Sequence, residues 1–251
     1  MSTSPEIPTA LIQGSSRGIG LALTRALLER GWRVVATCRS PDTAHQLTDL
    51  APAHPGLSVV ALDVSDEGSI SRAAGQIREQ VERVNLLINA AGVLHGPGFA
   101  PEKKLEQLDA TALRSVFEVN AFGPALVLKH FKPLLQHTER CVVANLSARV
   151  GSIGDNRLGG WYAYRASKAA QNMFTKCASL ELGRGSRRAT VIAIHPGTVE
   201  TDLSAPFAKD ASVKKRFSPE RAAAQILTIC DDVTEEQTGT FFAWDGSTIE
   251  W

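Results

Sequence analysis

The sequence predicts an α/β fold, a doubly wound parallel sheet of about seven strands with helices on both faces. Two observations predict it. Strand-like and helix-like runs alternate almost from end to end of the 251 residues. Several strand-like runs are apolar at consecutive positions rather than alternate ones, which indicates strands that are buried on both faces. The length suits one large α/β domain, so we expect a single domain over residues 1–251.

The strand-like runs are short and aliphatic. They cover residues 10–14, 33–38, 57–64, 86–90, 141–146, 190–194 and 240–244. The helix-like runs repeat apolar residues at helical spacing. They cover residues 21–30, 69–83, 105–135 (one helix or two), 164–182 and 219–230. Gly31 is expected to end the first helix, and Pro219 to begin the last.

Three segments have no regular pattern: residues 97–104, 152–161 and 203–216. Each follows the end of a predicted strand. Ligands of open α/β sheets bind outside the carboxyl ends of the strands. We therefore expect these segments to form the walls and lid of a substrate site.

Composition argues against several classes of protein. The chain is 43% hydrophobic and 21% charged, with a net charge of +1 and with Lys and Arg spread along it. This distribution disfavours a nucleic-acid footprint or a basic membrane patch. No apolar run reaches the length of a membrane span, and residues 1–8 lack the features of a secretory signal. We expect no nucleic-acid partner and no membrane insertion.

The four cysteines, Cys38, Cys141, Cys177 and Cys230, are far apart and form no CxxC pair. Lone thiols in apolar segments are typical of reduced core residues. We therefore expect no metal site and a cytoplasmic protein.

A glycine-rich loop follows the first strand and opens the first helix. It reads Gly14-Ser15-Ser16-Arg17-Gly18-Ile19-Gly20. Glycines permit a tight turn and a close approach to a pyrophosphate, and a helix N-terminus supplies free N–H groups. The strand–turn–helix context favours a Rossmann-type nucleotide site over an ordinary turn. The expected cofactor contacts are Gly14, Ser16, Arg17, Gly18, Ile19 and Gly20.

The end of the second strand bears on the choice between NAD and NADP. An acidic residue there would accept bonds from the adenosine ribose and would repel a 2′-phosphate. This chain has Cys38-Arg39 instead. Arg39 and Arg17 are placed to face that phosphate, although surface arginines are often merely solvated. The expected cofactor is NADP(H).

Two further strand ends suit the nucleotide. Asp63 and Val64 lie at the end of the third strand, where Asp63 either accepts from the adenine amino group or caps the next helix. The fourth strand ends in Asn89-Ala90-Ala91-Gly92, whose small residues would let a cofactor lie flat on the backbone.

Taken together, these motifs resemble the short-chain dehydrogenase/reductase family over essentially the whole chain. They are the glycine loop, Asn89-Ala90-Ala91-Gly92, Asn120, Tyr164-xxx-Lys168 and Pro196-Gly197, in the family's order. Within the family, residues 36–39, 159–168 and 244–246 are most similar to sniffer-type carbonyl reductases and C-factor-like proteins. The resemblance implies a seven-stranded sheet, a nicotinamide cofactor, and reduction of carbonyls or oxidation of alcohols. It also implies a homodimer or homotetramer that pairs through helices 105–135 and 164–182.

Tyr164 and Lys168 are the expected catalytic pair. Residues four apart on a helix share a face. A carbonyl that accepts a hydride needs a nearby proton donor, and an adjacent ammonium together with the positive nicotinamide ring would lower the pKa of tyrosine. A plain surface pair is the alternative. By resemblance, Lys168 also binds the nicotinamide ribose, and Asn120 holds a water that links Lys168 to solvent.

The sixth strand leads into Pro196-Gly197-Thr198-Val199. By resemblance, this backbone binds the nicotinamide carboxamide, and Thr201 lies near the amide or diphosphate. The preceding His195 is interpreted as a packed histidine. Asp155 and Arg157 are interpreted as solvated loop charges.

The chain departs from the family pattern in three places. Gln13 replaces a threonine before the first glycine, and the loop before Tyr164 is longer than usual. The third departure concerns the catalytic serine, whose position holds Ala148. Ser147 and Ser152 lie nearby, but neighbouring residues on an extended strand point to opposite sides. Ser147 is therefore a candidate replacement that cannot be assumed to reach the site.

The function that these features predict is an NADP-dependent oxidoreductase acting on a small, uncharged carbonyl or alcohol. The alternative is a low-turnover, nucleotide-bound regulatory or signalling protein. Ala148 favours the alternative, whereas the intact Tyr164, Lys168 and Asn120 favour the enzyme.

Overall fold

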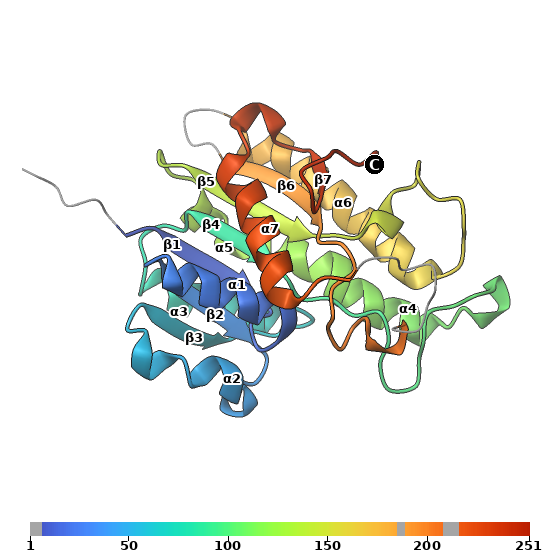
Figure 1. The fold of residues 1–251 in the computed structure, drawn as a ribbon, viewed down its shortest axis with the longest axis horizontal. Helices are drawn as coiled ribbons and strands as arrows, with labels where there is room; N and C mark the ends of the chain where they lie inside the picture. Colours follow the sequence, from blue (N-terminus) through green and yellow to red (C-terminus); the bar gives the residue numbers. More distant parts are fainter. Residues whose placement is uncertain (1–6, 185–188, 208–215) are drawn as a thin grey trace, which may run out of the picture.

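The computed structural model describes residues 7–184, 189–207 and 216–251 (Figure 1). A sheet of seven strands runs through it, with every neighbouring pair parallel and the order β3-β2-β1-β4-β5-β6-β7. The strands are β1 (Thr9–Gln13), β2 (Arg33–Cys38), β3 (Leu57–Ala61), β4 (Leu86–Asn89), β5 (Cys141–Leu146), β6 (Ala189–His195) and β7 (Phe241–Ala243). The predicted doubly wound parallel sheet is confirmed.

Within the described residues, seven α-helices connect or follow these strands. They are α1 (Gly18–Glu29), α2 (His45–Thr48), α3 (Glu67–Arg78), α4 (Ala110–Phe117), α5 (Gly123–Leu135), α6 (Tyr162–Leu182) and α7 (Pro219–Asp232). A π-helical turn, Glu118–Phe122, joins α4 to α5. Short 3-10 turns lie at Pro41–Thr43, Ala51–Ala53, Leu105–Gln107, Arg149–Gly151, Ala205–Phe207 and Glu235–Gln237.

The helices cover both faces of the sheet. α1 and α7 pack together on one face, while α3, α5 and α6 lie on the other (Figure 1). Strand β1 shows why the sheet needs two covers, because all five of its residues are buried. Ile12 packs into the cluster under α1 and α7, and its neighbour Leu11 packs into the cluster with Ile77 and Phe131. Consecutive side chains on a strand point to opposite faces, so a continuously apolar strand requires a helix layer on each side.

The region predicted as one or two long helices is divided into three parts. Asp109 begins α4, because its carboxylate accepts hydrogen bonds from the N–H groups of Thr111 and Ala112. The π-helical turn then interrupts the regular helical ladder before α5 begins at Gly123. Such turns insert an extra residue into a helix and are frequent at functional sites.

Other boundaries differ by a few residues. β3 ends at Ala61 rather than at residue 64, and α3 begins at Glu67 because Asp66 caps it by accepting from the N–H of Gly68. Helix α2 was not predicted, since four residues are too few to show helical periodicity.

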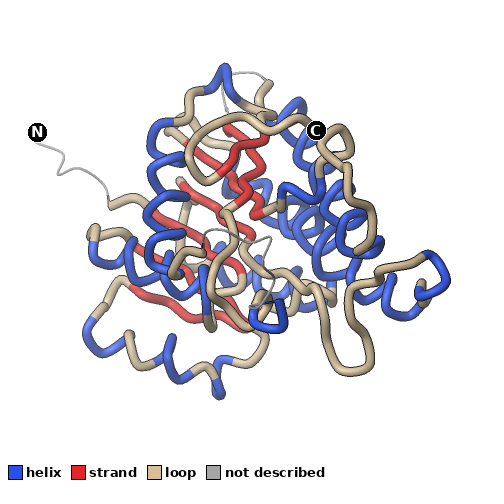
Figure 2. The backbone as a smooth tube through the Cα atoms, turned by 45° about the vertical axis from the view of Figure 1, so that its right-hand side comes forward, coloured by secondary structure: helices blue, strands red, loops and turns tan. Residues whose placement is uncertain are grey.

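The loops that follow the carboxyl ends of the strands gather on one side of the molecule (Figures 1 and 2). Predicted loops 97–104 and 152–161 both lie there and have no α-helix or strand. Of the predicted segment 203–216, residues 208–215 lie outside the described residues. This arrangement puts the candidate substrate loops beside the strand ends that the nucleotide motifs follow.

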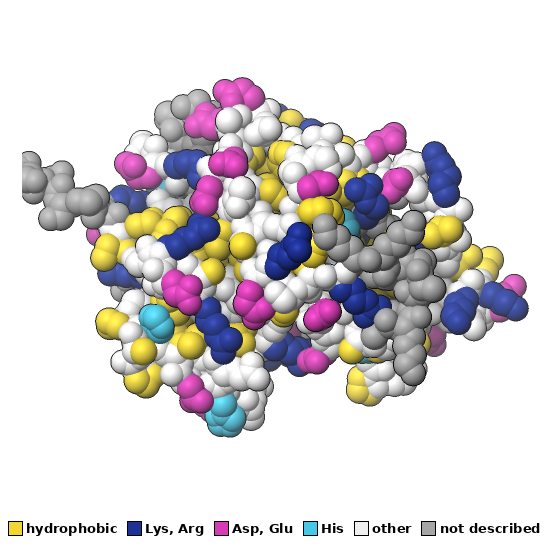
Figure 3. Space-filling view, viewed as in Figure 1, with side chains coloured by type: hydrophobic (Ala, Val, Ile, Leu, Met, Phe, Trp, Pro, Cys, Tyr) yellow, Lys and Arg dark blue, Asp and Glu magenta, His cyan; other side chains and the backbone are white. Residues whose placement is uncertain are grey.

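Charges of both signs are mixed over the face shown in Figure 3, and neither sign gathers into one large patch. Among the described residues, no helix is long and apolar enough to cross a membrane.

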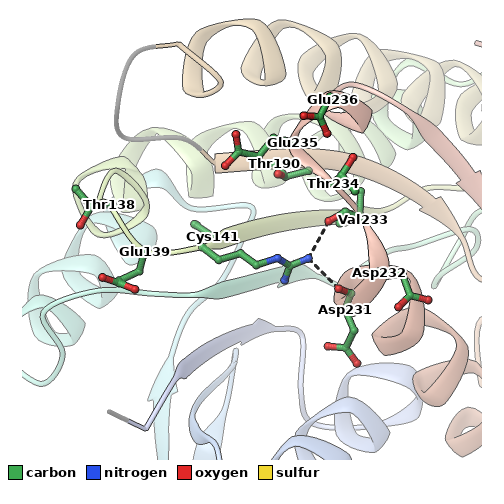
Figure 4. A pocket seen from close by; sticks show the side chains of 11 residues that line it. Thr138, Glu139, Cys141, Thr190, Asp231, Asp232, Val233, Thr234, Glu235 and Glu236 are labelled. Atoms are coloured by element: carbon green, nitrogen blue, oxygen red, sulfur yellow. Dashed lines mark hydrogen bonds between the residues drawn. The ribbon is translucent and has the colours of Figure 1, made fainter. Parts of the chain in front are cut away.

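Arg140 lies directly before β5, at the amino ends of the strands, and connects the sheet to α7. Its guanidinium donates to the carbonyl oxygens of Cys230, Asp231 and Val233, at 2.8, 3.1 and 2.9 Å. These carbonyls end α7, where a cation complements the helix dipole. A pocket of about 500 Å³ lies here, lined by several acidic side chains (Figure 4). It lies at the amino ends of β5 and β6, away from the nucleotide motifs.

We predict that Arg140→Met lowers the free energy of unfolding by about 1–3 kcal/mol, because three helix-end carbonyls lose a charged donor. Urea denaturation measures the loss. Arg30→Met is the matched control, since Arg30 forms an exposed ion pair with Asp231 at the same helix end, at 2.9 Å. Such exposed pairs contribute under about 1 kcal/mol. Equal losses in the two variants would contradict the capping role of Arg140.

Candidate active site

The glycine loop after β1 is folded so tightly that Gly14 and Gly20 leave no room for a Cβ atom. Gly14 has a φ of +87°, and the N–H groups of Gly14 and Ser15 both donate to the carbonyl of Thr37. A Cβ atom at Gly14 would lie 2.7 Å from the nitrogen of Ala91, and one at Gly20 would lie 2.1 Å from the Gly14 oxygen. The loop therefore keeps the backbone of three strand ends in close contact.

The N-terminus of α1 fits an anionic ligand. Arg17 occupies the N-cap position without a side-chain cap, and the first turn contains no acidic residue. Ser16 and Ile19 belong to this same half-buried turn. Gly18 has a φ of +55°, and a Cβ there would lie 3.1 Å from the side chain of Thr201. The uncapped N–H groups and positive end of the helix suit a phosphate group, as a dinucleotide requires.

The two arginines expected to face a 2′-phosphate are differently placed. Nε of Arg17 lies 3.4 Å from a carboxylate oxygen of Asp202, and both side chains are largely exposed. Exposed pairs of this kind are weak, so a phosphate could compete for Arg17. Arg39 is exposed directly after β2, and no acidic residue ends that strand.

Asp63 has a local role that differs from the capping alternative. Its carboxylate accepts from the N–H and the hydroxyl of Ser65, at 2.9 and 2.6 Å. Asp66 is the residue that caps α3, so the interpretation of Asp63 as that cap was wrong. Val64 is buried, and a Cβ atom at Gly123 would lie 2.8 Å from its side chain.

The ends of β4 and β5 carry a buried chain of polar side chains. The amide of Asn89 donates to Asn145 at 2.7 Å, and the amide of Asn145 donates to Thr175 on α6 at 2.8 Å. The carbonyl oxygen of the Asn89 side chain is buried without a partner among the described residues. Buried polar atoms are usually paired, so this oxygen is available to accept a hydrogen bond from a ligand or ordered water at the strand ends.

Small residues follow Asn89 at the surface of the strand ends. Ala90 and Ala91 are half-buried, and Gly92 is exposed. Gln13 explains one departure from the family pattern, because its side-chain oxygen accepts from the N–H of Ala91 at 3.2 Å. The glutamine therefore ties the loop after β4 to the end of β1.

Tyr164 and Lys168 lie together in the first two turns of α6, and both are buried. Nζ of Lys168 lies 5.9 Å from the centre of the Tyr164 ring. Burial raises the pKa of Tyr164 and lowers that of Lys168 to about 7. Lys168 at this distance does not offset the rise, so the phenol keeps its proton at neutral pH.

Asn120 lies in the π-helical turn and is fully buried. Its side-chain oxygen accepts from the N–H of Val93 at 2.8 Å, and its amide donates to the carbonyl of Val93 at 2.7 Å and to the hydroxyl of Ser167 at 3.1 Å. A Cβ at Gly92 would lie 3.5 Å from Asn120 and 3.9 Å from Nζ of Lys168. Both expected partners of Tyr164 therefore border the same exposed glycine.

Gln171 is a contact of Lys168 that the sequence analysis missed. Nζ of Lys168 donates to the side-chain oxygen of Gln171 at 2.9 Å and to the carbonyl of Leu146 at 2.8 Å. Gln171 is buried, and its amide nitrogen has no partner among the described residues. The spacing of Lys168 and Gln171 could have indicated this contact, because residues three apart on a helix are neighbours.

The hydroxyl groups near the missing serine are engaged elsewhere. Ser147 donates to the side chain of Asn172 on α6 at 2.6 Å and is buried. Ser152 is buried and accepts from the N–H of Asp155 at 3.0 Å. Ala148 is half-buried with an extended backbone, φ −145° and ψ 145°. Successive side chains of an extended chain point to opposite sides, so Ser147 points toward α6 and Ala148 away from it.

The turn after β6 is held by a second segment. Gly197 has a φ of +79°, and a Cβ there would lie 2.5 Å from the ring of Phe217. The carbonyl of Thr198 accepts from the N–H of Phe217 at 2.9 Å, and Val199 is buried beside it. Pro196 is half-buried at the strand end. Residues 196–199 and Thr201 thus lie next to the glycine loop, through the contact of Thr201 with Gly18.

The remaining charged candidates have structural explanations. Burial and, to a smaller extent, nearby Arg149 lower the pKa of His195 to about 4 against an opposing effect of Asp245, so His195 is neutral at pH 7. Asp155 forms an ion pair with Arg149 at 3.4 Å, and Arg157 contacts the carbonyl of Asn156. Glu102, in loop 97–104, was not singled out, yet its buried carboxylate accepts from the N–H of Ala163 at 3.2 Å. No sequence pattern indicated that contact, because the two residues are 61 positions apart.

Comparison with known proteins gives consistent matches. Residues 8–212 match the model of a family described as short chain dehydrogenase. The 1-hydroxy-2-glutathionyl-2-methyl-3-butene dehydrogenase of Rhodococcus sp. (strain AD45) is 33% identical over 244 residues, which are 97% of this chain and 99% of that protein.

Two solved structures are similar over nearly the whole chain. The NADPH-bound carbonyl reductase from chicken fatty liver has a TM-score of 0.87 and 30% identity, covering 98% of this chain and 100% of its own. The carbonyl reductase Sniffer of D. melanogaster has a TM-score of 0.86 and 27% identity, with the same coverage. The order of the motifs, the sheet and these matches agree: the chain belongs to the short chain dehydrogenase family of oxidoreductases.

Proposed function

We propose that this protein is an NADP(H)-dependent reductase of small carbonyl compounds that also catalyses the reverse oxidation of alcohols. One observation carries the proposal: Tyr164 and Lys168 are buried together on α6. They lie beside the same strand ends as the glycine loop, which leads into the uncapped N-terminus of α1. The chicken carbonyl reductase is NADPH-bound, and the Rhodococcus relative is a dehydrogenase of an alcohol, which supports both directions.

We propose that the following residues hold the cofactor. They are Gly14, Ser16, Arg17, Gly18, Ile19, Gly20, Arg39, Asp63, Val64, Asn89, Ala90, Ala91, Gly92, Tyr164, Lys168, Pro196, Gly197, Thr198, Val199 and Thr201. The glycine cradle and the free helix N-terminus suit the diphosphate. Arg39, with no acid at the end of β2, favours NADP(H) over NAD(H).

The bound nicotinamide would supply the hydride, and in its oxidised form a positive charge. Tyr164 acts as proton donor, and burial keeps its phenol protonated until the substrate oxygen accepts the proton. Lys168 stabilises the phenolate that remains. The pKa of Lys168 near 7 lets it exchange protons at working pH. The π-helical turn at Asn120 is proposed to hold the water that resupplies the proton.

A second candidate function is a nucleotide-bound regulatory protein with little turnover. The observation that favours it is the absence of a hydroxyl at Ala148, together with the bond from Ser147 to Asn172. An enzyme with this site would depend on Tyr164 alone to polarise the substrate oxygen. The intact pair of Tyr164 and Lys168 favours the enzyme, because a sensor has no need of a proton donor.

Apolar side chains are exposed on the two helical regions expected to form a dimer or tetramer. Phe122 precedes α5, and Met173, Phe174 and Leu180 lie on α6. These side chains support the proposed homodimer or homotetramer. All four cysteines are free thiols, which supports a reducing, cytoplasmic location.

We predict that the purified protein oxidises NADPH with members of a panel of quinones, aldehydes and diketones. Tyr164→Phe should lower kcat by about 10²- to 10⁴-fold while NADPH binding is kept, because the proton donor is lost. Tyr162→Phe is the matched control, since Tyr162 is an exposed tyrosine on the same helix. Absence of turnover in a wild-type protein that binds NADPH would favour the regulatory function.

Arg39→Asp should shift cofactor preference toward NADH. A carboxylate there would repel the 2′-phosphate and accept bonds from a ribose hydroxyl. We expect the ratio of kcat/KM for NADPH over NADH to fall by at least about tenfold, the equivalent of one charged hydrogen bond. Arg25→Asp, an equal charge change on the exposed face of α1, is the control. An unchanged ratio would refute the assignment of Arg39.

Ala148→Ser should raise kcat, because it restores a hydrogen-bond donor where charge develops on the substrate oxygen. We expect a rise of about tenfold or more, below the 10²–10³ typical of a complete oxyanion donor. Ser147→Ala removes a hydroxyl bonded to Asn172, so its main effect should be a loss of about 1–3 kcal/mol in the free energy of unfolding. A rate that falls in Ser147→Ala and stays constant in Ala148→Ser would show that Ser147 is the working hydroxyl.

A further inference from the structure

The backbone that leads into α6 adopts an unusual conformation. Gly159, Gly160 and Trp161 have φ values of +64°, +66° and +50° in succession. Among the described residues, Trp161 is the one non-glycine residue with a positive φ. A bulky side chain in the left-handed region costs about 1–2 kcal/mol. Such a conformation persists only where surrounding contacts impose it, and it is typical of functional sites.

Glu102 supplies two of those contacts from loop 97–104. Its main-chain carbonyl accepts from the N–H of Trp161, and its carboxylate accepts from the N–H of Ala163 at 3.2 Å. The side chain is well enclosed, with Glu102 only 5% exposed. Both bonds engage N–H groups at the start of α6, where a helix has no internal acceptors for them.

The helix has no cap of its own. Trp161 occupies the N-cap position and offers no side-chain acceptor, and the first turn has no acidic residue. A carboxylate at a helix N-terminus is stabilising through charge-assisted bonds and the helix dipole. Glu102 therefore takes the place of the missing cap from a distant part of the chain.

Arg165 holds the other side of the segment. Its Nε donates to the carbonyls of Gly159 and Gly160, at 3.1 and 3.0 Å, and Nη1 donates to Val150 at 3.3 Å. The left-handed segment is thus held between Glu102 and Arg165. Loop 97–104 is itself anchored, because the N–H groups of Lys103 and Lys104 donate to the side chain of Gln107.

The contacts of Glu102 and Arg165 with the segment before α6 form a clamp. The clamped segment contacts Tyr164, the proposed proton donor, through Trp161. The ring centres of Trp161 and Tyr164 are 6.3 Å apart, with the planes at 74°. Edge-to-face rings at this distance attract one another. Tyr164 is the third residue of α6, so a shift of the first turn would move its hydroxyl group directly.

We propose that Glu102 is a positioning residue of the active site. From loop 97–104 it caps the N-terminus of α6 and holds the left-handed segment Gly159–Trp161. The ring of Trp161 is thereby kept packed against Tyr164. The assignment rests on the proposed function for its effect on turnover, but its structural part is independent of catalysis. It joins loop 97–104 to the end of loop 152–161 through its carbonyl bond to Trp161, and to the start of α6 through its carboxylate bond to Ala163. A substrate that displaces loop 97–104 would also displace the proton donor.

The experiment compares Glu102→Ala and Glu102→Gln with wild type. Hydrogen exchange measured by mass spectrometry follows peptides over residues 159–168. We expect at least about tenfold faster exchange there in Glu102→Ala, the equivalent of losing one charged hydrogen bond. Glu102→Gln keeps an acceptor for Ala163 and should recover most of the protection. Glu106→Ala is the matched control, an exposed acid in the following turn.

Steady-state kinetics supply the second readout. Misplacing a reacting group by about 1 Å can cost 10²-fold, so kcat should fall about tenfold to 10²-fold in Glu102→Ala, with the KM for NADPH unchanged. Glu102→Gln should restore most of kcat, which a merely destabilised fold would not show. If Glu102→Ala fails to fold, Glu102→Asp replaces it, because its shorter carboxylate loses reach to Ala163.

The outcomes separate the two proposals. Wild-type exchange over residues 159–168 in Glu102→Ala or Glu102→Asp overturns the positioning role, whatever the kinetics. Faster exchange with an unchanged kcat also overturns it, since Tyr164 would then not depend on the cap. An inactive wild-type protein counts against the proposed function, while the exchange result still decides whether Glu102 holds the segment.

Discussion

The burial of one ammonium group organises the active site. Nζ of Lys168 is buried away from water and donates hydrogen bonds to the carbonyl of Leu146 and the side chain of Gln171. Burying a charge is costly unless hydrogen bonds compensate, and this cost is visible in the lowered pKa of Lys168. The bond to Leu146 ties α6 to the carboxyl end of β5. It thereby sets the distance between the helix that carries Tyr164 and the strand ends where the nucleotide loop lies.

Polar side chains extend this connection through the interior. Asn89, Asn145 and Thr175 link β4, β5 and α6, and Thr175 donates to the carbonyl of Gln171. A buried network of this kind specifies one arrangement, because each broken bond would leave a buried polar group unpaired. The ends of β4 and β5, proposed as the floor of the nucleotide site, and Lys168 are therefore held by the same set of bonds.

The sequence was sufficient for the parallel sheet and the main motifs, since both depend on local patterns. Continuous apolar strands predict two helix layers, and the spacing of Tyr164 and Lys168 predicts a shared face. It was insufficient for the contacts that depend on long-range packing. Glu102 meets Ala163 across 61 positions, and no local pattern announces that meeting. The π-helical turn within 105–135 was missed because its apolar spacing differs from a regular helix by only one residue.

The hydroxyl groups of this site explain what Ala148 changes. Ser147 and Ser152 are both committed to bonds that hold the chain after β5. Neither can turn toward the substrate without leaving its partner unpaired, at a cost of about 1–3 kcal/mol. In the proposed reaction, stabilisation of the substrate oxygen then depends on the Tyr164 hydroxyl, whose pKa is raised by burial. A single donor must be positioned more accurately than one of a pair, because no neighbour compensates for its displacement. The clamp of Glu102 and Arg165 on the backbone before Tyr164 meets that requirement.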